Sequence, residues 1–416
     1  MHADKQQLLD WIEADRDELI GFLSRFIQAK TPNPPGETRL AVAFICEFLR
    51  SNDLPFRVID PKPEFSNIVG SFEGAAGAGK HLVLNGHIDV FPVGEEQWTH
   101  GPWSGAIADG KIHGRGACDM KCGTTASIFT FAYLHRLRDR LKGRLTLTCV
   151  SDEETFGPWG ARYLMKHHPE VHGDCCLNGE PSSPYTIRFG EKGPLWLLFT
   201  IKARGAHGAY THLSASAIKI AAQLIGDLES LGDIEAPAPH NVGTAVIQAR
   251  DAIERALGPG AADIVQKVTL NIGRIDGGLK VNMIPGECKV EADIRLPVGL
   301  EKPRVMDAVK KILARHPGVT VEEINYNPPS WCDPFGEMVG FIQYNVRSIS
   351  SHDPKPVISL GGTDARLWRY LGIPAYVYGP RPTGMGSVDE QVEIEEFIHI
   401  VKTHALSAYD YLTRAT

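Results

Sequence analysis

This sequence lacks the features that mark several large classes of protein. It has no run of basic residues and a formal net charge of −7, so nucleic acid and anionic membranes are poor candidate partners. No segment approaches the roughly 20 apolar residues that a membrane-spanning helix requires. Residues 1–23 carry acids among their apolar positions, which predicts an amphipathic surface helix and not a signal peptide. We therefore expect a cytoplasmic protein that binds neither nucleic acid nor membrane.

The eight cysteines are scattered along the chain and form no CxxC pair, which argues against a thiolate metal site. Since no export signal is apparent, we expect a reducing compartment, where disulfides are rare. Buried thiols behave as small hydrophobic side chains. We predict packing roles for them, including Cys118, although it directly precedes Asp119.

Composition and length indicate an ordinary globular protein with more than one structural unit. Hydrophobic residues make up 43% and charged residues 22% of the 416 residues. Short apolar runs alternate with helical patterns at 39–51 and 124–138, which predicts an α/β fold with a mainly parallel central sheet flanked by helices. The expected strands are 67–72, 81–85, 145–150, 175–177 and 375–378. Ligands of such sheets bind at the carboxyl ends of the strands.

A segment of different character interrupts this pattern at residues 192–327. Its expected elements follow the order strand, helix, strand, strand, helix, strand, which is the ferredoxin-like arrangement of a self-contained α+β domain. We therefore divide the chain into a first part of the α/β domain at 1–191, an inserted domain at 192–327 and a second part of the α/β domain at 328–416.

Four polar clusters each follow a predicted strand. They are His87-Ile-Asp89, Asp119-Met120-Lys121, Glu153-Glu154 and Glu180-Pro181. Each cluster alone is compatible with a loop cap or a solvated charge. Four clusters at one edge of a sheet are harder to explain in this way, because gathered carboxylates repel one another. A bound divalent cation would offset that repulsion, so we predict a metal site here.

The residue types suggest how such a site would work. Imidazole and carboxylates are ordinary ligands for zinc, manganese or cobalt. Asp89, two residues after His87, is expected to accept the second N–H of the imidazole and fix its tautomer. The adjacent Glu153 and Glu154 point apart in extended backbone, so one would bind metal while the other takes a proton from the water that the metal activates. This division of roles predicts a hydrolase.

Seven segments carry a further signal: GHIDVFP, WSGAIADGKIHGRGACDMKCG, SDEETFGPWGA, NGEP, GAHGAYTHLSASAI, VNMIPGECKVEADIR and GGTDARLWRYLGIPAYVYGP. Through them the chain resembles, over nearly its whole length, the family of metal-dependent deacylases and exopeptidases. That family includes acetylornithine deacetylase, succinyl-diaminopimelate desuccinylase, aminoacylase and glutamate carboxypeptidase. The resemblance implies a catalytic domain of the zinc-exopeptidase type with an inserted lid that also forms a dimer.

The resemblance implies a role for each residue of the polar clusters. His87 would bind one metal ion, Asp119 would bridge two, and Glu180 would complete the first site. Glu154 would bind the second ion, and Glu153 would be the general acid/base. Glutamate at position 180, in place of aspartate, is more similar to the deacylase branch than to the carboxypeptidase branch.

The resemblance also implies functional residues outside those clusters. His207 in the inserted domain would reach the active site of a partner subunit and polarise the scissile carbonyl, which requires at least a homodimer. A guanidinium can hold a carboxylate through two parallel hydrogen bonds. The residues implied in substrate binding are Asn282, Arg295 and Arg366, which would hold an anionic end, and Gly362 and Thr363, which would line the pocket.

One position departs from that family. Its members carry a histidine ligand in a pattern similar to H-x-x-[DN]-E, whereas this chain has Gly386 there, followed by Asp389-Glu390. The second site thereby keeps only the carboxylates of Asp119 and Glu154, while the first keeps three protein ligands. We predict one tightly bound divalent ion per chain (zinc, manganese or cobalt) and an impaired second site.

The resulting prediction is a hydrolase of a carbon–nitrogen bond, most simply the amide of an N-acyl amino acid or a related small substrate that bears a carboxylate. Three alternatives stay open. They are a single-metal aminohydrolase that deaminates an unusual or aromatic amino acid, a dipeptidase or carboxypeptidase, and an inactive relative that only binds a ligand. The presence of Glu153, Asp89 and His207 argues against the inactive relative, because binding alone needs no general base.

Overall fold

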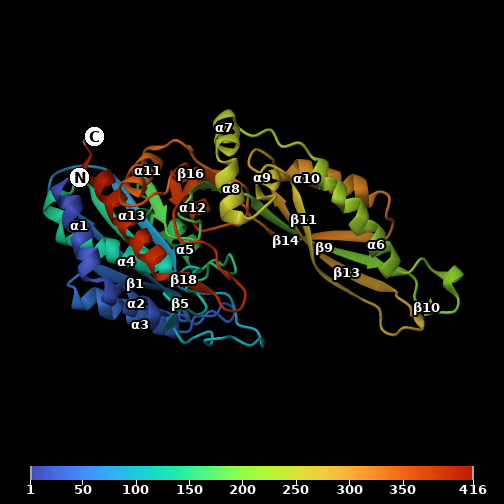
Figure 1. The fold of residues 1–416 in the computed structure, drawn as a ribbon. Helices are drawn as coiled ribbons and strands as arrows, with labels where there is room; N and C mark the ends of the chain where they lie inside the picture. Colours follow the sequence, from blue (N-terminus) through green and yellow to red (C-terminus); the bar gives the residue numbers. More distant parts are fainter. Residues whose placement is uncertain (1, 415–416) are drawn as a thin grey trace.

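A nine-stranded sheet, here called the large sheet, lies at the centre of the larger part of the molecule in the computed structural model, which describes residues 2–414 (Figure 1). In spatial order its strands are β1 (Phe56–Lys62), β2 (Phe65–Glu73), β6 (Arg144–Val150), β3 (His81–His87), β7 (Cys175–Asn178), β17 (Ala375–Val377), β8 (Thr186–Glu191) and β15 (Ser330–Trp331), with β16 (Lys355–Ser359) paired to β8. The central strands β6, β3, β7 and β17 are parallel, whereas β2 and β8 pair with this group in the antiparallel sense. The predicted α/β class with a mainly parallel central sheet is confirmed.

Helices cover both faces of the large sheet, which explains why its central strands are almost continuously apolar. One side is covered by α4 (Lys121–Arg136) and α13 (Ile394–Thr413), the other by α5 (Ala161–His167) and α12 (Ala365–Tyr370). Leu82 and Leu84 of β3 join the core beneath α4 and α13, whereas Val83 between them joins the core beneath α5 and α12. This alternation follows from the two-residue period of a strand. The strand ends are therefore where polar side chains can gather.

The N-terminal segment differs from its prediction as a single helix. It forms two helices, α1 (Ala3–Ala14) and α2 (Arg16–Gln28), with Asp15 between them. Aspartate is a poor residue for a helix interior because its carboxylate competes for nearby backbone N–H groups. Both helices are amphipathic as expected, and the rings of Phe22 and Phe26 on α2 are buried against Phe44 of α3 (Arg39–Ser51).

A second, four-stranded sheet projects away from the large sheet (Figure 1). Its antiparallel order is β11 (Thr269–Gly277), β13 (Glu287–Leu296), β9 (Gly193–Lys202) and β14 (Val319–Tyr326), and one face is covered by α6 (Ala217–Leu228) and α10 (Lys302–Leu313). Leu195, Leu197 and Phe199 of β9 point toward these helices and form a core of their own. The order β9, α6, β11, β13, α10, β14 agrees with the ferredoxin-like prediction. The division of the chain at 192 and 327 remains a prediction.

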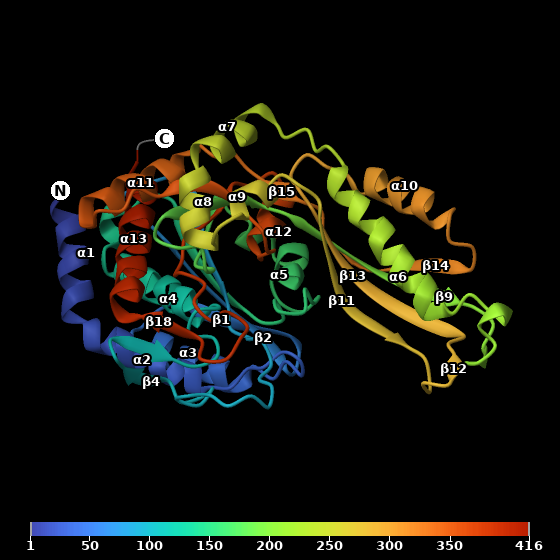
Figure 2. The ribbon, with the colours of Figure 1, turned by 45° about the vertical axis from the view of Figure 1, so that its right-hand side comes forward.

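Three short helices between α6 and β11 were absent from the sequence-based expectation. They are α7 (His240–Gln248), α8 (Arg250–Leu257) and α9 (Ala261–Ile264). Although they lie within the inserted segment, Val242, Ala245 and Ile253 belong to the core of the large sheet, and α7 contacts β16. Figure 2 shows these helices beside the large-sheet part of the molecule, with α5 and α12 on the side that faces the second sheet. The inserted segment is thus anchored on the large sheet by more than its two connections.

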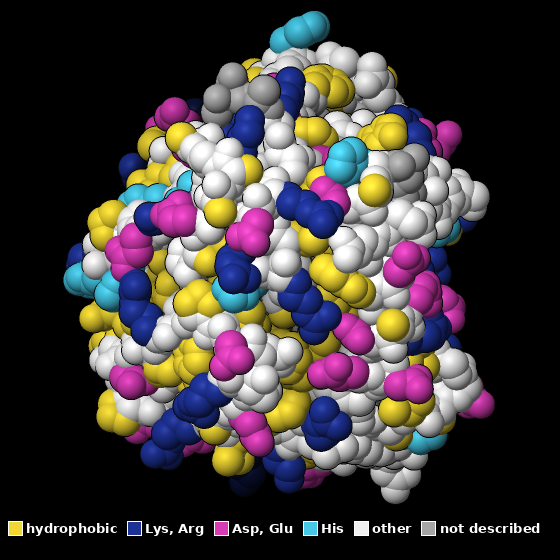
Figure 3. All heavy atoms as spheres, turned by 90° about the vertical axis from the view of Figure 1, so that its left-hand side faces the viewer, with side chains coloured by type: hydrophobic (Ala, Val, Ile, Leu, Met, Phe, Trp, Pro, Cys, Tyr) yellow, Lys and Arg dark blue, Asp and Glu magenta, His cyan; other side chains and the backbone are white. Residues whose placement is uncertain are grey.

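The remaining elements are small or peripheral. They are β4 (Ala106–Ala108), β5 (Lys111–His113) and β18 (Gln391–Glu393), which form a three-stranded sheet, β10 (Ala206–His207) with β12 (Met283–Ile284), and α11 (Glu337–Ile349). None of the helices in residues 2–414 combines the length and the apolar composition needed to cross a bilayer. On the face drawn in Figure 3, acidic and basic side chains are intermingled.

Candidate active site

The predicted polar clusters meet at one edge of the large sheet. His87 is the last residue of β3, Glu153 follows β6, and Glu180 follows β7. Because β6, β3 and β7 are adjacent and parallel, their carboxyl ends lie side by side. Asp119 joins them from the loop that precedes α4.

A close approach of backbone brings Asp119 and Glu180 together. A Cβ atom added at Gly123 of α4 would lie 1.9 Å from the carbonyl oxygen of Gly179, so only glycine fits at this contact. The start of α4 can therefore pack directly against the end of β7. His87 Nε2 then lies 3.2 Å from Asp119 Oδ1 and 3.3 Å from Glu180 Oε1.

The donor atoms of the cluster suit a divalent cation. Two groups of three residues overlap in one member. Each residue of a group offers one ligand atom, and the three ligand atoms of a group all lie within 4.8 Å of one another. These groups are His87, Asp119 and Glu154, and His87, Glu153 and Glu180. His87 is common to both, so the imidazole stands at the centre of the cluster. One nitrogen with several carboxylate oxygens is a donor set for zinc, manganese or cobalt.

The electrostatics of the cluster favour the same interpretation. Burial raises the pKa of Glu154 well above its usual value, and the Asp119 carboxylate raises it further. Burial and Asp119 likewise raise the pKa of Glu180 to about 7. For His87, burial lowers the pKa, but Glu180, Asp119 and Asp89 outweigh it and raise the pKa well above the usual value. One oxygen of Glu154 is buried without a hydrogen-bond partner. A positive charge among these oxygens would relieve both the repulsion and the unmet bond.

Asp89 contacts His87 through a different atom from the one expected. The carbonyl oxygen of Asp89 is the acceptor nearest to His87 Nδ1, at 2.9 Å, whereas carboxylate Oδ1 lies 3.6 Å away. The carboxylate instead accepts from Asn33 Nδ2 at 2.9 Å and from the backbone N–H groups of Glu153 and Glu154, at 3.2 and 3.1 Å. Asp89 therefore orients the imidazole with its backbone and fixes the turn that carries both glutamates with its side chain. Nothing in the sequence predicted a role for Asn33, because an isolated asparagine among prolines is typical of a turn.

Arg366, which is expected to hold the anionic end of a substrate, contacts a carboxylate of the protein itself. Its guanidinium is 1% exposed, lies 3.3 Å from Glu153 Oε1 and also donates to the Thr363 carbonyl. Thr363 Oγ1 in turn donates to Glu191 Oε2 at 2.9 Å, and Gly362 lies against Phe156 and Glu191. Arg366 thus connects Glu153 with the Thr363 backbone, and the substrate-binding roles of Gly362, Thr363 and Arg366 remain predictions.

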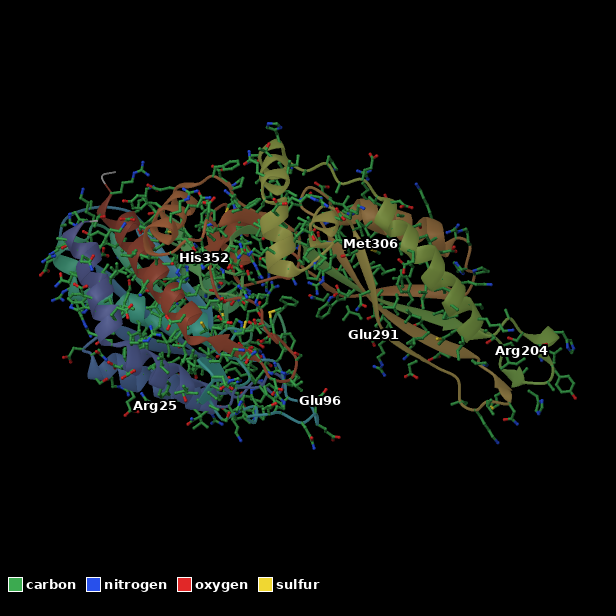
Figure 4. All side chains as sticks on the ribbon, viewed as in Figure 1. Arg25, Glu96, Arg204, Glu291, Met306 and His352 are labelled. Atoms are coloured by element: carbon green, nitrogen blue, oxygen red, sulfur yellow. The ribbon has the colours of Figure 1, made fainter. Side chains whose placement is uncertain are left out.

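The residues expected in the lid do not meet this cluster within one chain. His207 on β10 is exposed at the far end of the second sheet, where Gly208 N–H donates to the Asn282 carbonyl at 2.7 Å (Figure 1). Arg204, labelled in Figure 4, marks the same end of the molecule. Arg295 lies on β13 next to the connection with the large sheet, and its Nη2 donates to Asp293 Oδ2 at 2.8 Å. The geometry separates His207 and Asn282 from His87 in this chain.

Gly386 lies in an exposed loop with a φ of +71°, and a Cβ atom added there would meet only Phe91, at 3.9 Å. Glu390, four residues later, is fully buried. It accepts from Arg115 Nη1 at 2.6 Å and from backbone N–H groups that include that of Asp119, at 3.0 Å. Glu390 therefore holds the loop that presents Asp119. Sequence analysis noted this glutamate but assigned it no role.

A cluster of this kind can hold a metal and move a proton, and the fold and site together define a metal-dependent hydrolase. Residues 83–410 match the model of peptidase family M20/M25/M40, and the chain belongs to that family. A succinyl-diaminopimelate desuccinylase of Marinobacter nauticus is 28% identical over 76% of this chain and 80% of its own length. Aminoacylase-1 of Sus scrofa is 26% identical over 94% of both chains.

Solved structures with the same fold include an M20 metallo-carboxypeptidase from Sulfolobus solfataricus, with a TM-score of 0.81 and 18% identity over 95% of this chain and 100% of that one. Human carnosine dipeptidase 1 has a TM-score of 0.79 and 16% identity over 99% and 100%. Hydrolases of this family act on amide or peptide carbon–nitrogen bonds and depend on divalent metal. The predicted family and enzyme class are thus confirmed, whereas the roles of individual residues remain predictions.

Proposed function

We propose that this protein hydrolyses the amide of an N-acyl amino acid, or of a related small substrate that bears a carboxylate. The observation that carries the proposal is the convergence of Asp119, Glu153, Glu154 and Glu180 around His87 at the strand ends of the large sheet. The similarity to a desuccinylase and to an aminoacylase, both named for removal of an acyl group, supports the substrate class.

The four residues His87, Asp119, Glu154 and Glu180 would hold zinc, manganese or cobalt. When bound, the ion would act as a Lewis acid that polarises the substrate carbonyl and lowers the pKa of water. Glu153 takes a proton from the attacking water and returns it to the departing nitrogen, the usual work of a general acid/base. Asp89 holds the turn that positions Glu153, and Arg366 orients its carboxylate through the 3.3 Å contact.

The same proposal includes a homodimer in which the lid of one subunit completes the site of the other. His207 and Asn282 share the exposed end of the second sheet, far from the cluster of their own chain, so they would act in a partner's site. Asn282, Arg295 and Arg366 would hold the substrate's anionic end, and Gly362 and Thr363 would line the pocket. We expect the enzyme to work in the cytoplasm and to need neither nucleic acid nor membrane.

A substrate panel tests this function. The purified protein is assayed with N-acetyl and N-succinyl amino acids, with dipeptides and with aromatic amino acids, before and after chelation and after return of zinc, manganese or cobalt. Metal-dependent release of free amino acid from the N-acyl compounds supports the proposal. Ammonia release from free amino acids would support the aminohydrolase instead, dipeptide cleavage the peptidase, and ligand binding without turnover of any compound the inactive relative.

A further inference from the structure

An aromatic contact joins the second sheet to the turn that carries Glu153. The ring of Trp196 on β9 lies 5.9 Å, centroid to centroid, from the ring of Phe156. Phe156 is three residues after Glu153, and its backbone N–H donates to the Glu153 carbonyl at 2.7 Å. The two rings therefore connect an element of the second sheet with the catalytic turn of the large sheet.

Trp196 points toward the large-sheet part of the molecule. Its neighbours Leu195 and Leu197 are buried beneath α6 and α10, so by strand alternation Trp196 projects from the opposite face. Trp196 is paired with Asp293 of β13, which shares its face with Glu291. Figure 4 shows Glu291 projecting from the side of the sheet away from these helices. Because β9 is hydrogen-bonded on both edges, Trp196 moves with the second sheet as a body.

Phe156 in turn supports the arginine that contacts Glu153. The guanidinium carbon of Arg366 lies 4.7 Å from the centre of the Phe156 ring, within the range of a cation–π contact. The Arg366 Nε atom is buried and has no hydrogen-bond partner among the described residues. The guanidinium is therefore held by the Phe156 ring and by two acceptors, Glu153 Oε1 and the Thr363 carbonyl. Trp196, Phe156, Arg366 and Glu153 thus form an unbroken series of contacts.

The backbone of Phe156 is in a conformation that a phenylalanine rarely adopts. Its φ is +52°, in the left-handed region that favours glycine. Such conformations persist where the surrounding structure over-determines them, and they concentrate at functional sites. Here the strain places an aromatic ring between Trp196 and Arg366. Gly362 lies next to this ring, since a Cβ atom added there would meet it at an ordinary contact distance of 3.5 Å.

We propose that Trp196 and Phe156 are positioning residues, which hold the Arg366 guanidinium on Glu153 only when the second sheet lies as it does in this structure. The inference rests on the proposed role of Glu153 and extends it: the placement of the lid sets the orientation of the proton-transfer group. A displacement of the second sheet would remove the contact that supports the Phe156 ring and would release Arg366.

The test compares Trp196→Ala, Phe156→Ala and the double variant. We expect each single change to lower kcat about tenfold with KM within twofold, and the double variant to be no slower than either one, since coupled residues are non-additive. Trp196→Phe, which keeps an aromatic ring, should restore most of kcat. Metal content and melting temperature, measured alongside, should match the wild type.

The control is a second aromatic pair with an arginine. Trp11 stacks on Tyr133 at 6.4 Å, with Arg136 5.6 Å from the Trp11 ring, away from the metal cluster. Trp11→Ala should leave kcat unchanged. An unchanged kcat in Trp196→Ala, effects that multiply in the double variant, or a rise in KM alone would overturn the proposal. Glu153→Gln, assayed in parallel, separates the two proposals, because near-normal turnover of that variant would refute the role of Glu153 itself.

Discussion

At the edge of the large sheet most residues of the site are buried, with His87 1% and Glu180 5% exposed, and their donor atoms lie close together. Beyond the end of the second sheet, at the β10–β12 pair, His207 and Asn282 are exposed and far from that cluster, although the resemblance gives them equally direct roles. The difference lies in what completes each set. Buried carboxylates need a cation to offset their repulsion, whereas in the proposed function the exposed lid residues would need the surface of another subunit. In that proposal one chain carries two incomplete half-sites, one that would need a metal and one that would need a partner.

The largest loss of activity is expected from a substitution in the buried half-site. Glu153→Gln keeps the size of the side chain but cannot accept a proton, so turnover should fall by at least about a hundredfold, the scale of losing acid–base catalysis. Metal content, measured by elemental analysis, should stay at the wild-type value. Glu96→Gln, the same change in an exposed loop (Figure 4), should leave turnover unchanged. Near-normal turnover of Glu153→Gln would disprove the assignment of the base.

The next largest loss of activity is expected from a substitution in the exposed half-site. His207→Ala removes the group proposed to polarise the carbonyl in the partner's site, and loss of one such donor costs about a hundredfold in kcat. Mixing this variant with Glu153→Gln, under conditions of subunit exchange, should restore about a quarter of wild-type activity, because half of the dimers then contain one complete site. Light scattering checks that the mixture is dimeric, and mass tags check that the subunits have exchanged. If activity does not recover once exchange is demonstrated, His207 does not act across the dimer.

A smaller effect, on metal affinity, is expected from a substitution of a residue that supports the buried half-site. Glu390→Gln removes the charge that holds Arg115 and the backbone of Asp119. Outer residues of this kind typically change metal affinity by about 10- to 100-fold, so metal should be lost at lower chelator concentration. Asp389→Asn is the matched control, since Asp389 bonds to Thr99 and not to the Asp119 loop. Equal metal retention in both variants would contradict this role of Glu390.

Glu390 also illustrates what the sequence could reveal. His87, Glu153 and Glu180 were predictable because each lies at, or within three residues after, the end of an apolar strand, and parallel strands bring their ends together. The contacts of Glu390 join segments 271 residues apart, and no local pattern encodes them. The same holds for the choice between carbonyl and carboxylate at Asp89, which depends on the turn geometry. The helices α7–α9 escaped prediction because they are short and their apolar positions match a core formed by another segment.

The smallest expected change, from about one metal to two, concerns Gly386. On the predicted assignment of ligands, the second site would keep only Asp119 and Glu154, and two carboxylates without a nitrogen donor should bind zinc weakly. We therefore expect about one ion per purified chain. Gly386→His should raise that number toward two, because the loop is exposed and a Cβ at this position meets only Phe91, at an ordinary contact distance. The φ of +71° costs a non-glycine residue about 1–3 kcal/mol, which an added metal–nitrogen bond can offset.

Ser387→His, one residue along the same loop, is the control and should leave the stoichiometry at one. If the unmodified protein already holds two ions tightly, another residue supplies the missing donor, and the comparison between a complete first site and an impaired second site fails.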